Sequence, residues 1–471
     1  MRPTPATAAM CLVLFVGCHG GDHAAAPYHA AFSPVTADGD MLRDAQGRAL
    51  ILRGVNARVD GVFDVNFTDG RAPREVVPPL DATDAAAMKA AGFTLLRLPV
   101  NWSAIEPMPG MFDSTYLDKI AAVVDTMRGS GVYVLIDLHE DGYSKELCED
   151  GAPLWAIDPQ PTMLVGGPGP LDGTIDCHSS GAALQAFDNF FTDQMMLQES
   201  YATMAGMLAA RFVGDTQVIG YEIMNEPISI DAQIDAFNIK VGTAMRAADP
   251  GHLIFFEPSA TRNFTNGAEI SNTPYSITGG VYSVHVYSDV FGSGTGLTDG
   301  TYVDVLSDSI SGARLEAQAW KTPLVITEFG IGADNAVAGA WLGHFLDNAD
   351  SALASWTLWL WKEESQGFWG LYTLNSDGSW SPRPAMFASV SRPYAQAIGG
   401  DPTAMTWDGT TLTVKFNGRD DVPGTHDLFW NAAAPTFTCD GKTIVATSVD
   451  SAGSRYTVAC GGKGAHTLTA R

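Results

Sequence analysis

Short apolar runs alternate with longer amphipathic stretches along most of this chain. The runs have the length of buried strands, and the stretches between them carry apolar residues at helical spacing. Eight runs stand out: 49–56, 94–99, 133–139, 218–226, 253–258, 281–287, 324–328 and 355–361. Helices are predicted over 117–129, 183–212, 234–248 and 303–319. Eight strand–helix alternations predict an α/β fold, a (β/α)8 TIM barrel built on a parallel sheet.

The pattern changes near Arg392-Pro393. Beyond it lie short alternating runs separated by Gly, Asp and Asn, at 412–416, 426–430, 443–448, 456–460 and 466–470. Such runs predict a small antiparallel β-sandwich. We therefore divide the chain into an N-terminal segment over residues 1–26, a barrel over 27–397 and a C-terminal β-sandwich over 398–471.

Two predicted connections of the barrel are unusually long. One follows the first strand and covers 57–79, and the other follows the third strand and covers 140–180. Long loops inside a compact domain usually serve as lids or binding surfaces. We expect the second loop, which is rich in Gly and Pro, to form such a lid.

The N-terminal segment has the features of a targeting signal. Arg2 precedes an apolar stretch over 6–16 that is too short to anchor in a bilayer. The stretch ends in Leu-Phe-Val-Gly-Cys, which resembles a bacterial lipoprotein signal with Cys18 as the lipidated residue; simple cleavage near 24–26 is the alternative. In either case we expect a mature protein outside the cytoplasm, secreted or lipid-anchored.

The cysteines that follow the signal support this location. They form two local pairs, Cys148 with Cys177 and Cys439 with Cys460. Disulfides are typical of oxidising compartments, so we predict a bond within each pair. Their spacing does not match a zinc site and no His-Glu-x-x-His sequence occurs, so we expect no metal and no cofactor.

Composition narrows the partners. Lys and Arg number 27 against 53 Asp and Glu, which gives a net charge of −26 over 471 residues. A surface this acidic argues against nucleic acid and favours a neutral or weakly charged substrate. We expect the protein to be a monomer.

Two glutamates carry the strongest chemical signal. The fourth run ends in Asn225-Glu226-Pro227, where the proline stops the strand ladder, and the seventh run ends at Glu328. Barrel enzymes keep their chemistry at the carboxyl ends of the strands. A pair of carboxylates there is the minimum equipment for cleaving a glycosidic bond. The alternative is that both are solvated acids at strand ends.

The other strand ends supply side chains that could bind a sugar or orient a carboxylate. They are Arg97, Asp137, His139, Asn225, His285, Tyr287, Trp359 and Trp361. Period-two alternation predicts that Trp359 and Trp361 share one side of the last strand, where one stacks on a sugar face. Trp356 should point to the core, and we interpret Glu222 as structural.

In this order, Arg97, His139, Asn225-Glu226-Pro227, His285-x-Tyr287, Glu328 and the last-strand Trp resemble glycoside hydrolase family 5 over about residues 49–395. Segments 52–58, 137–144 and 151–156 resemble its endoglycoceramidase branch, which releases intact oligosaccharides from glycosphingolipids and carries a C-terminal β-sandwich. Many members of that branch have Gln where this chain has Glu140, which bears on the preferred glycan.

The resemblance implies that Glu226 is the general acid/base and Glu328 the nucleophile of a retaining double displacement. The chemistry needs a protonated acid beside an ionised nucleophile. Arg97 near Glu328 would hold that carboxylate charged, and Tyr287 could donate to it. Asn225 could bind the sugar 2-OH. His139 and His285 would position sugar or catalytic groups; the alternative is that they are hydrogen-bonded core residues.

The lid bears on the substrate. Apolar residues gather at 154–157, 163–165 and 290–291, and on the helix after the lid at Phe187, Phe190 and Phe191. An exposed apolar patch beside a sugar site would suit ceramide, and Trp155 would contact it. Alternatively, these residues pack the lid onto the barrel.

We therefore expect a glycosphingolipid or oligosaccharide substrate, with contact to a membrane surface or lipid micelle. Two other functions remain open. One is an endo-β-glycanase, such as a glucanase or mannanase, that acts on polysaccharide. The other is a non-catalytic carbohydrate- or lipid-binding protein.

Overall fold

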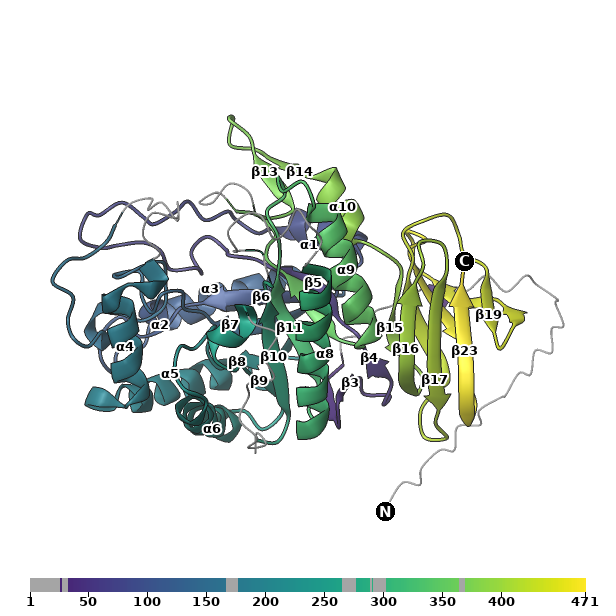
Figure 1. Cartoon of the computed structure of the whole chain (residues 1–471), viewed down its shortest axis with the longest axis horizontal. Coiled ribbons are helices and arrows are strands. Elements are labelled where there is room, and N and C mark those ends of the chain that lie inside the picture. Colours follow the sequence, from purple (N-terminus) through teal and green to yellow (C-terminus); the bar gives the residue numbers. More distant parts are fainter. Residues whose placement is uncertain are drawn as a thin grey trace, which may run out of the picture.

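The computed structural model describes residues 33–166, 177–264, 277–288, 290, 302–363 and 369–471, together with the backbone of 26–27 (Figure 1). The predicted signal segment up to residue 25, with Cys18, lies outside the described residues, as does Phe291. Within the described part, no helix is both long enough and apolar enough to cross a membrane.

Eight parallel strands close into a barrel, as the apolar runs predict. The strands are β5 (Arg53–Asn56), β6 (Leu95–Val100), β7 (Tyr133–Leu138), β8 (Val218–Glu222), β9 (Leu253–Phe256), β10 (Gly280–Val286), β11 (Leu324–Phe329) and β12 (Ser355–Leu358). They follow one another in sequence order around the ring, and pairing of β12 with β5 closes it. All their carboxyl ends therefore open on one face.

Helices cover the outside of the barrel (Figure 1). They are α1 (Ala82–Ala90), α2 (Trp102–Ile105), α3 (Ser114–Met127), α4 (Gly181–Phe191), α5 (Leu197–Arg211), α6 (Asp231–Ala248), α8 (Tyr302–Trp320), α9 (Ala338–Ser351) and α10 (Pro384–Val390). Shorter elements are η1 (Leu154–Ala156), η2 (Cys177–Ser179), η3 (Gln194–Met196), η4 (Ala260–Phe264) and the hairpin β13 (Tyr372–Leu374) and β14 (Trp380–Pro382).

The single long helix predicted over 183–212 is wrong. The chain breaks between α4 and α5, where Asp193, Met195 and Met196 have φ values of 56°, 57° and 58°. This left-handed conformation cannot continue a right-handed helix. The break lets α4 turn its phenylalanines inward, and Phe187, Phe190 and Phe191 are all buried in the main core.

The C-terminal part is a β-sandwich of two sheets. One has the order β1-β21-β22-β18-β15-β4-β3-β2 and the other β16-β17-β23-β19-β20. The strands are β1 (Ala26–Pro27), β2 (Thr36–Asp38), β3 (Met41–Arg43), β4 (Ala49–Leu50), β15 (Tyr394–Ile398), β16 (Asp401–Trp407), β17 (Leu412–Gly418), β18 (Thr425–Phe429), β19 (Phe437–Cys439), β20 (Lys442–Ile444), β21 (Ala446–Val449), β22 (Arg455–Ala459) and β23 (Gly464–Ala470). Among the strand pairs that the structure describes in this sandwich, β1–β21 is the parallel one and the others are antiparallel.

The first predicted strand, 49–56, is in fact two strands in two different sheets. Its first half, β4, pairs with β15 and β3 in the sandwich, and its second half, β5, enters the barrel. The chain before β5 therefore contributes strands to the C-terminal sandwich. Chain segments both before and after the barrel therefore belong to the sandwich.

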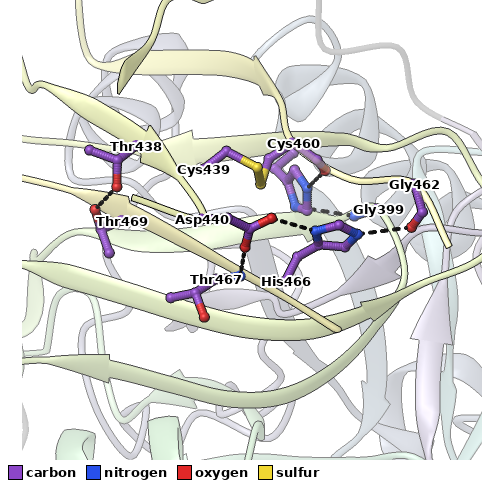
Figure 2. The surroundings of a disulfide bond; sticks show 10 residues. Gly399, Thr438, Cys439, Asp440, Cys460, Gly462, His466, Thr467 and Thr469 are labelled. Atoms are coloured by element: carbon purple, nitrogen blue, oxygen red, sulfur yellow. Dashed lines mark hydrogen bonds and ion pairs between the residues drawn. A yellow bond between two sulfur atoms is a disulfide. The ribbon is translucent and has the colours of Figure 1, made fainter. Parts of the chain in front are cut away.

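Both predicted disulfides are present. Cys148 bonds Cys177 in the long loop after β7, and Cys439 bonds Cys460 in the sandwich. Figure 2 shows the second bond among polar contacts that join neighbouring strands: Asp440 accepts from His466 Nδ1 at 2.8 Å and from the Thr467 N–H at 2.9 Å. Thr438 and Thr469 hydroxyls lie 2.7 Å apart across β19 and β23.

The seam between barrel and sandwich contains a buried charge cluster. Asp350 of α9 accepts from Arg53 Nη2 at 2.5 Å and from Arg392 Nη2 at 2.6 Å. The Arg53 guanidinium also lies 4.1 Å from the ring centre of Tyr394. Arg455 of the sandwich donates to the backbone oxygens of Lys89 and Phe93 at 3.1 and 3.3 Å. These contacts fix the two parts to each other.

Candidate active site

Arg97, on β6, lies at the centre of the barrel mouth and is completely buried. Its guanidinium contacts six side chains from other strand ends. Nε donates to Glu222, Nη1 to Asn56 Oδ1 at 3.0 Å and Glu328 Oε1 at 2.5 Å, and Nη2 lies 2.8 Å from Asn225 Oδ1, 3.1 Å from Asp137 Oδ2 and 3.5 Å from Glu257 Oε1. A guanidinium keeps its charge in proteins, so one fixed cation organises four carboxyl groups.

Glu328 stands on β11 with both oxygens held. Oε1 accepts from Arg97, and Oε2 accepts from the Tyr287 hydroxyl at 2.8 Å. The predicted contacts of Arg97 and Tyr287 with this carboxyl are therefore present. Burial raises the pKa of Glu328, although His285 and Arg97 oppose the rise.

Glu226 lies just beyond β8, which ends at Glu222. Its φ of 42° is rare for a residue other than glycine, and such strain concentrates at functional sites. The backbone is held there because the Glu226 N–H donates to Glu257 Oε2 at 3.2 Å. The Glu226 side chain is 21% exposed against 6% for Glu328, so it reaches the open part of the mouth.

The Glu226 carboxyl has two neighbours within hydrogen-bonding distance, Asn263 and His285. Oε1 accepts from Asn263 Nδ2 at 3.0 Å and lies 2.7 Å from His285 Nδ1. Burial by itself would raise the pKa of Glu226, but the hydrogen bond and charge of His285 lower it. Asn263 is at η4, outside any sequence pattern that could have indicated it.

The directions of the two shifts differ from those that the predicted roles require. In the free protein, the pKa of Glu226, the predicted acid, is lowered and that of Glu328, the predicted nucleophile, is raised. The cause is the position of His285, whose Nδ1 is close to Glu226 Oε1 at 2.7 Å and to Glu328 Oε2 at 3.6 Å. In the free protein, the proton that Glu226 would deliver is therefore held on the neighbouring imidazole.

The two carboxyl groups are close together. One oxygen of Glu226 and one of Glu328 lie within 4.8 Å of each other, with a His285 nitrogen within the same distance of both. Retaining glycosidases separate their two carboxyl groups by about 5–5.5 Å, whereas inverting enzymes need about 6.5–9.5 Å to fit a water. The spacing suits direct attack by one carboxylate.

A second group forms a flat surface at the mouth. Asp137 Oδ2 lies 2.6 Å from His139 Nδ1, and the His139 ring stacks on Trp359 with 5.5 Å between ring centres and an 8° interplanar angle. Burial lowers the pKa of His139 to about 4 and raises that of Asp137 to about 6. Arg58 approaches the same indole, 5.6 Å from its centre. Trp359 is half-buried, so a neutral, rigid aromatic surface is available for a sugar ring.

Asn225 is already partly engaged. Its Oδ1 accepts from Arg97, and its Nδ2 donates to the Glu140 backbone oxygen at 2.8 Å. One amide hydrogen remains for a ligand. The Glu140 carboxyl accepts from the Tyr143 N–H at 2.7 Å, so it closes a turn at the start of the long loop.

Trp361 is a correction to the sequence prediction. It is buried, packs against Phe93 and Tyr372, and donates Nε1–H to Asp84 Oδ1 at 2.9 Å. β12 ends at Leu358, so period-two alternation does not extend to Trp361. Trp356 is in the core as predicted.

Trp155 also differs from the prediction. Its Nε1–H donates to the Glu106 backbone oxygen at 3.0 Å, and its ring meets Trp102 edge-on at 5.4 Å. With Phe187, Phe190 and Phe191 buried as well, these aromatic residues pack the loop onto the barrel. Trp155 is a loop anchor in this structure.

Three residues that contact Arg97 are absent from the predicted site residues. Glu257 directly follows β9 and Asn56 ends β5, so both had the same strand-end signal as Glu226 and Glu328. Glu222, interpreted as structural, indeed anchors Arg97 from below and accepts from Ser283 and from Thr327 Oγ1, the latter at 3.2 Å.

Among the described residues, three groups of side chains that contain no disulfide-bonded cysteine have spacings that a metal ion could use. Two lie in the mouth, Glu226 with His285 and Glu328, and Glu222 with Glu257 and His285; the third is Asp141, Glu149 and His178 in the loop after β7. In the loop, His178 Nε2 lies 2.6 Å from Asp141 Oδ1 and 3.4 Å from Glu149 Oε1, so it forms an ion pair beside the Cys148–Cys177 bond.

Known proteins share this architecture. The model of the family described as cellulase (glycosyl hydrolase family 5) matches residues 61–365. Endoglycoceramidase I of Rhodococcus hoagii is 27% identical over 408 residues, 80% of this chain and 76% of its own. Endoglycoceramidase of Cyanea nozakii is 24% identical over 81% of this chain and 80% of its own.

Solved structures agree on the fold. A crystal structure of endogalactoceramidase superposes with a TM-score of 0.78 at 24% identity, covering 93% of this chain and 100% of the other. A ganglioside GM3 complex of endo-glycoceramidase II from Rhodococcus sp. gives a TM-score of 0.76 at 22% identity, covering 92% and 99%. The family match runs from the loop after β5 to beyond β12 and includes both strand-end glutamates, and the chain belongs to glycosyl hydrolase family 5, the glycosidases whose fold it shares.

Proposed function

We propose that this protein is a retaining glycosidase that cleaves the β-glycosidic bond between oligosaccharide and ceramide in glycosphingolipids. The carrying observation is the pair Glu226 and Glu328 with carboxylate oxygens within 4.8 Å, in a barrel mouth that has polar and apolar parts. The names of the relatives, endoglycoceramidase and endogalactoceramidase, support the lipid-linked substrate.

In the proposed reaction, Glu328 attacks the anomeric carbon while Glu226 gives a proton to the departing oxygen. Arg97 and Tyr287 hold the attacking carboxyl in place, one donor on each oxygen. A water then attacks the glycosyl–enzyme bond and returns a proton to Glu226. The anomeric configuration is retained, because each step inverts it once.

Exposed apolar side chains support a substrate with a lipid part. They lie on the loops that follow β6, β7 and β8, and are Met108, Met111, Leu154, Met163, Leu164, Met195, Met196 and Ile230. All precede the helix that returns to the opposite end of the barrel, so they belong to the mouth face. Exposed apolar groups on a protein this acidic suit contact with a micelle or membrane surface.

The substrate class is tested directly. Purified protein is incubated with a glycosphingolipid panel and, separately, with soluble β-glucan and β-mannan, and released sugars are separated from ceramide. We expect intact oligosaccharide and free ceramide from the lipids. Cleavage of the polysaccharides alone would replace this proposal with an endo-β-glycanase, and no cleavage of either would favour a binding protein.

The apolar loops are tested with a matched pair of variants. Met163→Ser should slow hydrolysis of a glycolipid in mixed micelles several-fold and leave a soluble aryl glycoside unaffected. Val445→Ser is the control, because Met163 and Val445 are both 81% exposed but Val445 lies in the sandwich. Equal rates for Met163→Ser and Val445→Ser on micelles would show that Met163 does not contribute to lipid binding.

We also propose that the protein acts outside the cytoplasm as a monomer. Two disulfides support an oxidising compartment. Cell fractionation, with mass spectrometry of the mature N-terminus, distinguishes lipidation at Cys18 from cleavage near 24–26. Cytoplasmic protein with an intact N-terminus would contradict the location, and sizing by light scattering checks the monomer.

A further inference from the structure

Glu257 is a buried carboxyl that the proposed reaction does not use. It follows β9, and its side chain is completely buried. Oε1 lies 3.2 Å from His285 Nε2 and 3.5 Å from Arg97 Nη2, and Oε2 accepts the Glu226 backbone N–H at 3.2 Å. It therefore contacts the presumed acid's backbone and the imidazole that binds the acid's side chain.

His285 joins the two carboxyl groups into a chain. Its Nδ1 lies 2.7 Å from Glu226 Oε1, and its Nε2 lies 3.2 Å from Glu257 Oε1. Each ring nitrogen thus faces a different carboxyl. Asn238 Nδ2 donates to the Glu257 backbone oxygen at 3.1 Å and helps hold the far end.

We propose that Glu257 is a positioning residue that acts through His285 to keep a proton available to Glu226. This inference rests on the proposed role of Glu226 as acid/base. As the leaving group departs, the proton on His285 Nδ1 passes to Glu226 Oε1 across their hydrogen bond, and Glu226 delivers a proton to the glycosidic oxygen. Glu226 is then ionised and takes a proton from the attacking water, and that proton returns to His285 Nδ1, so the chain is restored after each turnover.

The charges around the chain agree with this arrangement. Burial raises the pKa of Glu257 to about 8, with His285 opposing the rise. Burial would lower the pKa of His285, but the carboxyl groups of Glu257 and Glu328 hold it well above its ordinary range. As pH rises and Glu257 ionises, its negative charge raises the pKa at which the His285–Glu226 pair releases the proton that the two groups share. Arg97, beside Glu257 and Glu328, is the fixed opposing charge.

The test is the pH profile of Glu257→Gln, which retains the size of the side chain but cannot carry the charge. On a substrate with a poor leaving group we expect the alkaline limb of kcat/KM to move to lower pH by about one unit, so that kcat/KM falls about tenfold above about pH 8, where Glu257 of the parent protein is ionised. On an aryl glycoside whose leaving group needs no proton, the loss should be under threefold. A merely structural role would lower kcat/KM equally for both substrates and leave the alkaline limb at its original pH. That result would overturn the proposal.

Two further variants keep the test decisive. Glu257→Asp retains the charge and should keep the alkaline limb near its original pH while lowering the rate, even if Glu257→Gln folds poorly. Glu316→Gln is the matched control, because Glu316 is a buried carboxyl that binds Arg262 and Tyr282 on the outer side of the barrel. It should leave the limb unmoved; a shift in this variant equal to that of Glu257→Gln would also overturn the proposal.

Failure of this inference is distinguishable from failure of the proposed reaction. Glu226→Gln, measured with the same two substrates, reports on the acid/base role itself. One outcome is that Glu226→Gln loses far more activity on the substrate with the poor leaving group than on the aryl glycoside, while Glu257→Gln loses the same on both. In that case the Glu257–His285–Glu226 proposal is wrong and the acid/base role of Glu226 is retained. If neither variant shows such a difference between the substrates, the role of Glu226 is wrong.

Discussion

Two buried charge clusters in this protein have opposite balances. At the seam between barrel and sandwich, two arginines, Arg53 and Arg392, share the one buried carboxylate, that of Asp350, and Arg392 also pairs with the exposed Asp347. At the barrel mouth, one arginine, Arg97, faces Asp137, Glu222, Glu257 and Glu328, with Glu226 close by. Both clusters lie out of water, where an unmatched charge is costly.

The difference indicates what each cluster does. At the seam both oxygens of Asp350 have a cationic partner, and Arg53 gains a further contact over the Tyr394 ring. Such a cluster needs no exchange of protons. At the mouth burial outweighs the charges of Arg97 and His285 and raises the pKa of Asp137 to about 6 and that of Glu257 to about 8, which brings both groups close to neutral pH. Surplus acid in a cleft gives a site that can give and take protons.

The largest effect is expected from a substitution of Glu328 in the mouth cluster. We expect Glu328→Gln to lower turnover of every substrate by more than about 10⁴-fold, because no covalent intermediate can form. The folded state should persist, since the amide still accepts from Tyr287 and Arg97 loses one of several partners. Near-normal turnover of an aryl glycoside by this variant would contradict the assignment.

Glu226→Gln should have a large but selective effect. On a glycolipid we expect a loss of about 10²–10⁴-fold, the usual contribution of a general acid. On an activated aryl glycoside the first step should be nearly normal, and added azide should accelerate turnover by replacing water as the second nucleophile. Equal losses on both substrates would argue against a proton-donating role.

At the seam, stability should change and catalysis should not. Asp350→Asn leaves the buried guanidinium of Arg53 without its counter-charge, whereas Arg392 keeps Asp347, and we expect the free energy of unfolding to fall by about 3–5 kcal/mol. Denaturant titration measures this loss. Below the unfolding transition, kcat/KM should match the parent protein; a selective loss of activity in a fully folded Asp350→Asn sample would show that the two clusters are coupled.

The sandwich disulfide should give the smallest effect. Replacing Cys439 and Cys460 with serine opens a loop with a sequence separation of 21, which should cost about 3 kcal/mol by the loop-entropy argument. The melting temperature should fall while activity at moderate temperature is retained. A lost activity without a lowered melting temperature would give the sandwich a part in the reaction.

Much of this architecture could be predicted from short stretches of the sequence. Strand and helix periodicity depends on neighbouring residues, so the eight runs predicted eight barrel strands, and Asn225-Glu226-Pro227 and Glu328 were recognised where parallel strands end. The paired cysteines were predicted for a similar reason, because their loops are short. Even Glu257 and Asn56 had a strand-end signal that could have been used.

Other features depended on residues far apart in the chain. Alternation placed Trp361 in the cleft, but where β12 ends is decided by its neighbours, and the indole is bound to Asp84 in the core. Composition made Trp155 a lipid contact, whereas packing against Trp102 made it an anchor. The sequence predicted neither the break between α4 and α5 nor the strands before β5 that join the sandwich.

The protonation of the site was decided by tertiary structure alone. Arg97 and Glu328 are 231 positions apart, and His285 meets Glu226 across 59 positions and Glu257 across a neighbouring strand. The sequence by itself determined which acids stand at the barrel mouth. Only folding decided which of them hold protons, because burial and the distance to one guanidinium and one imidazole set each carboxyl's pKa.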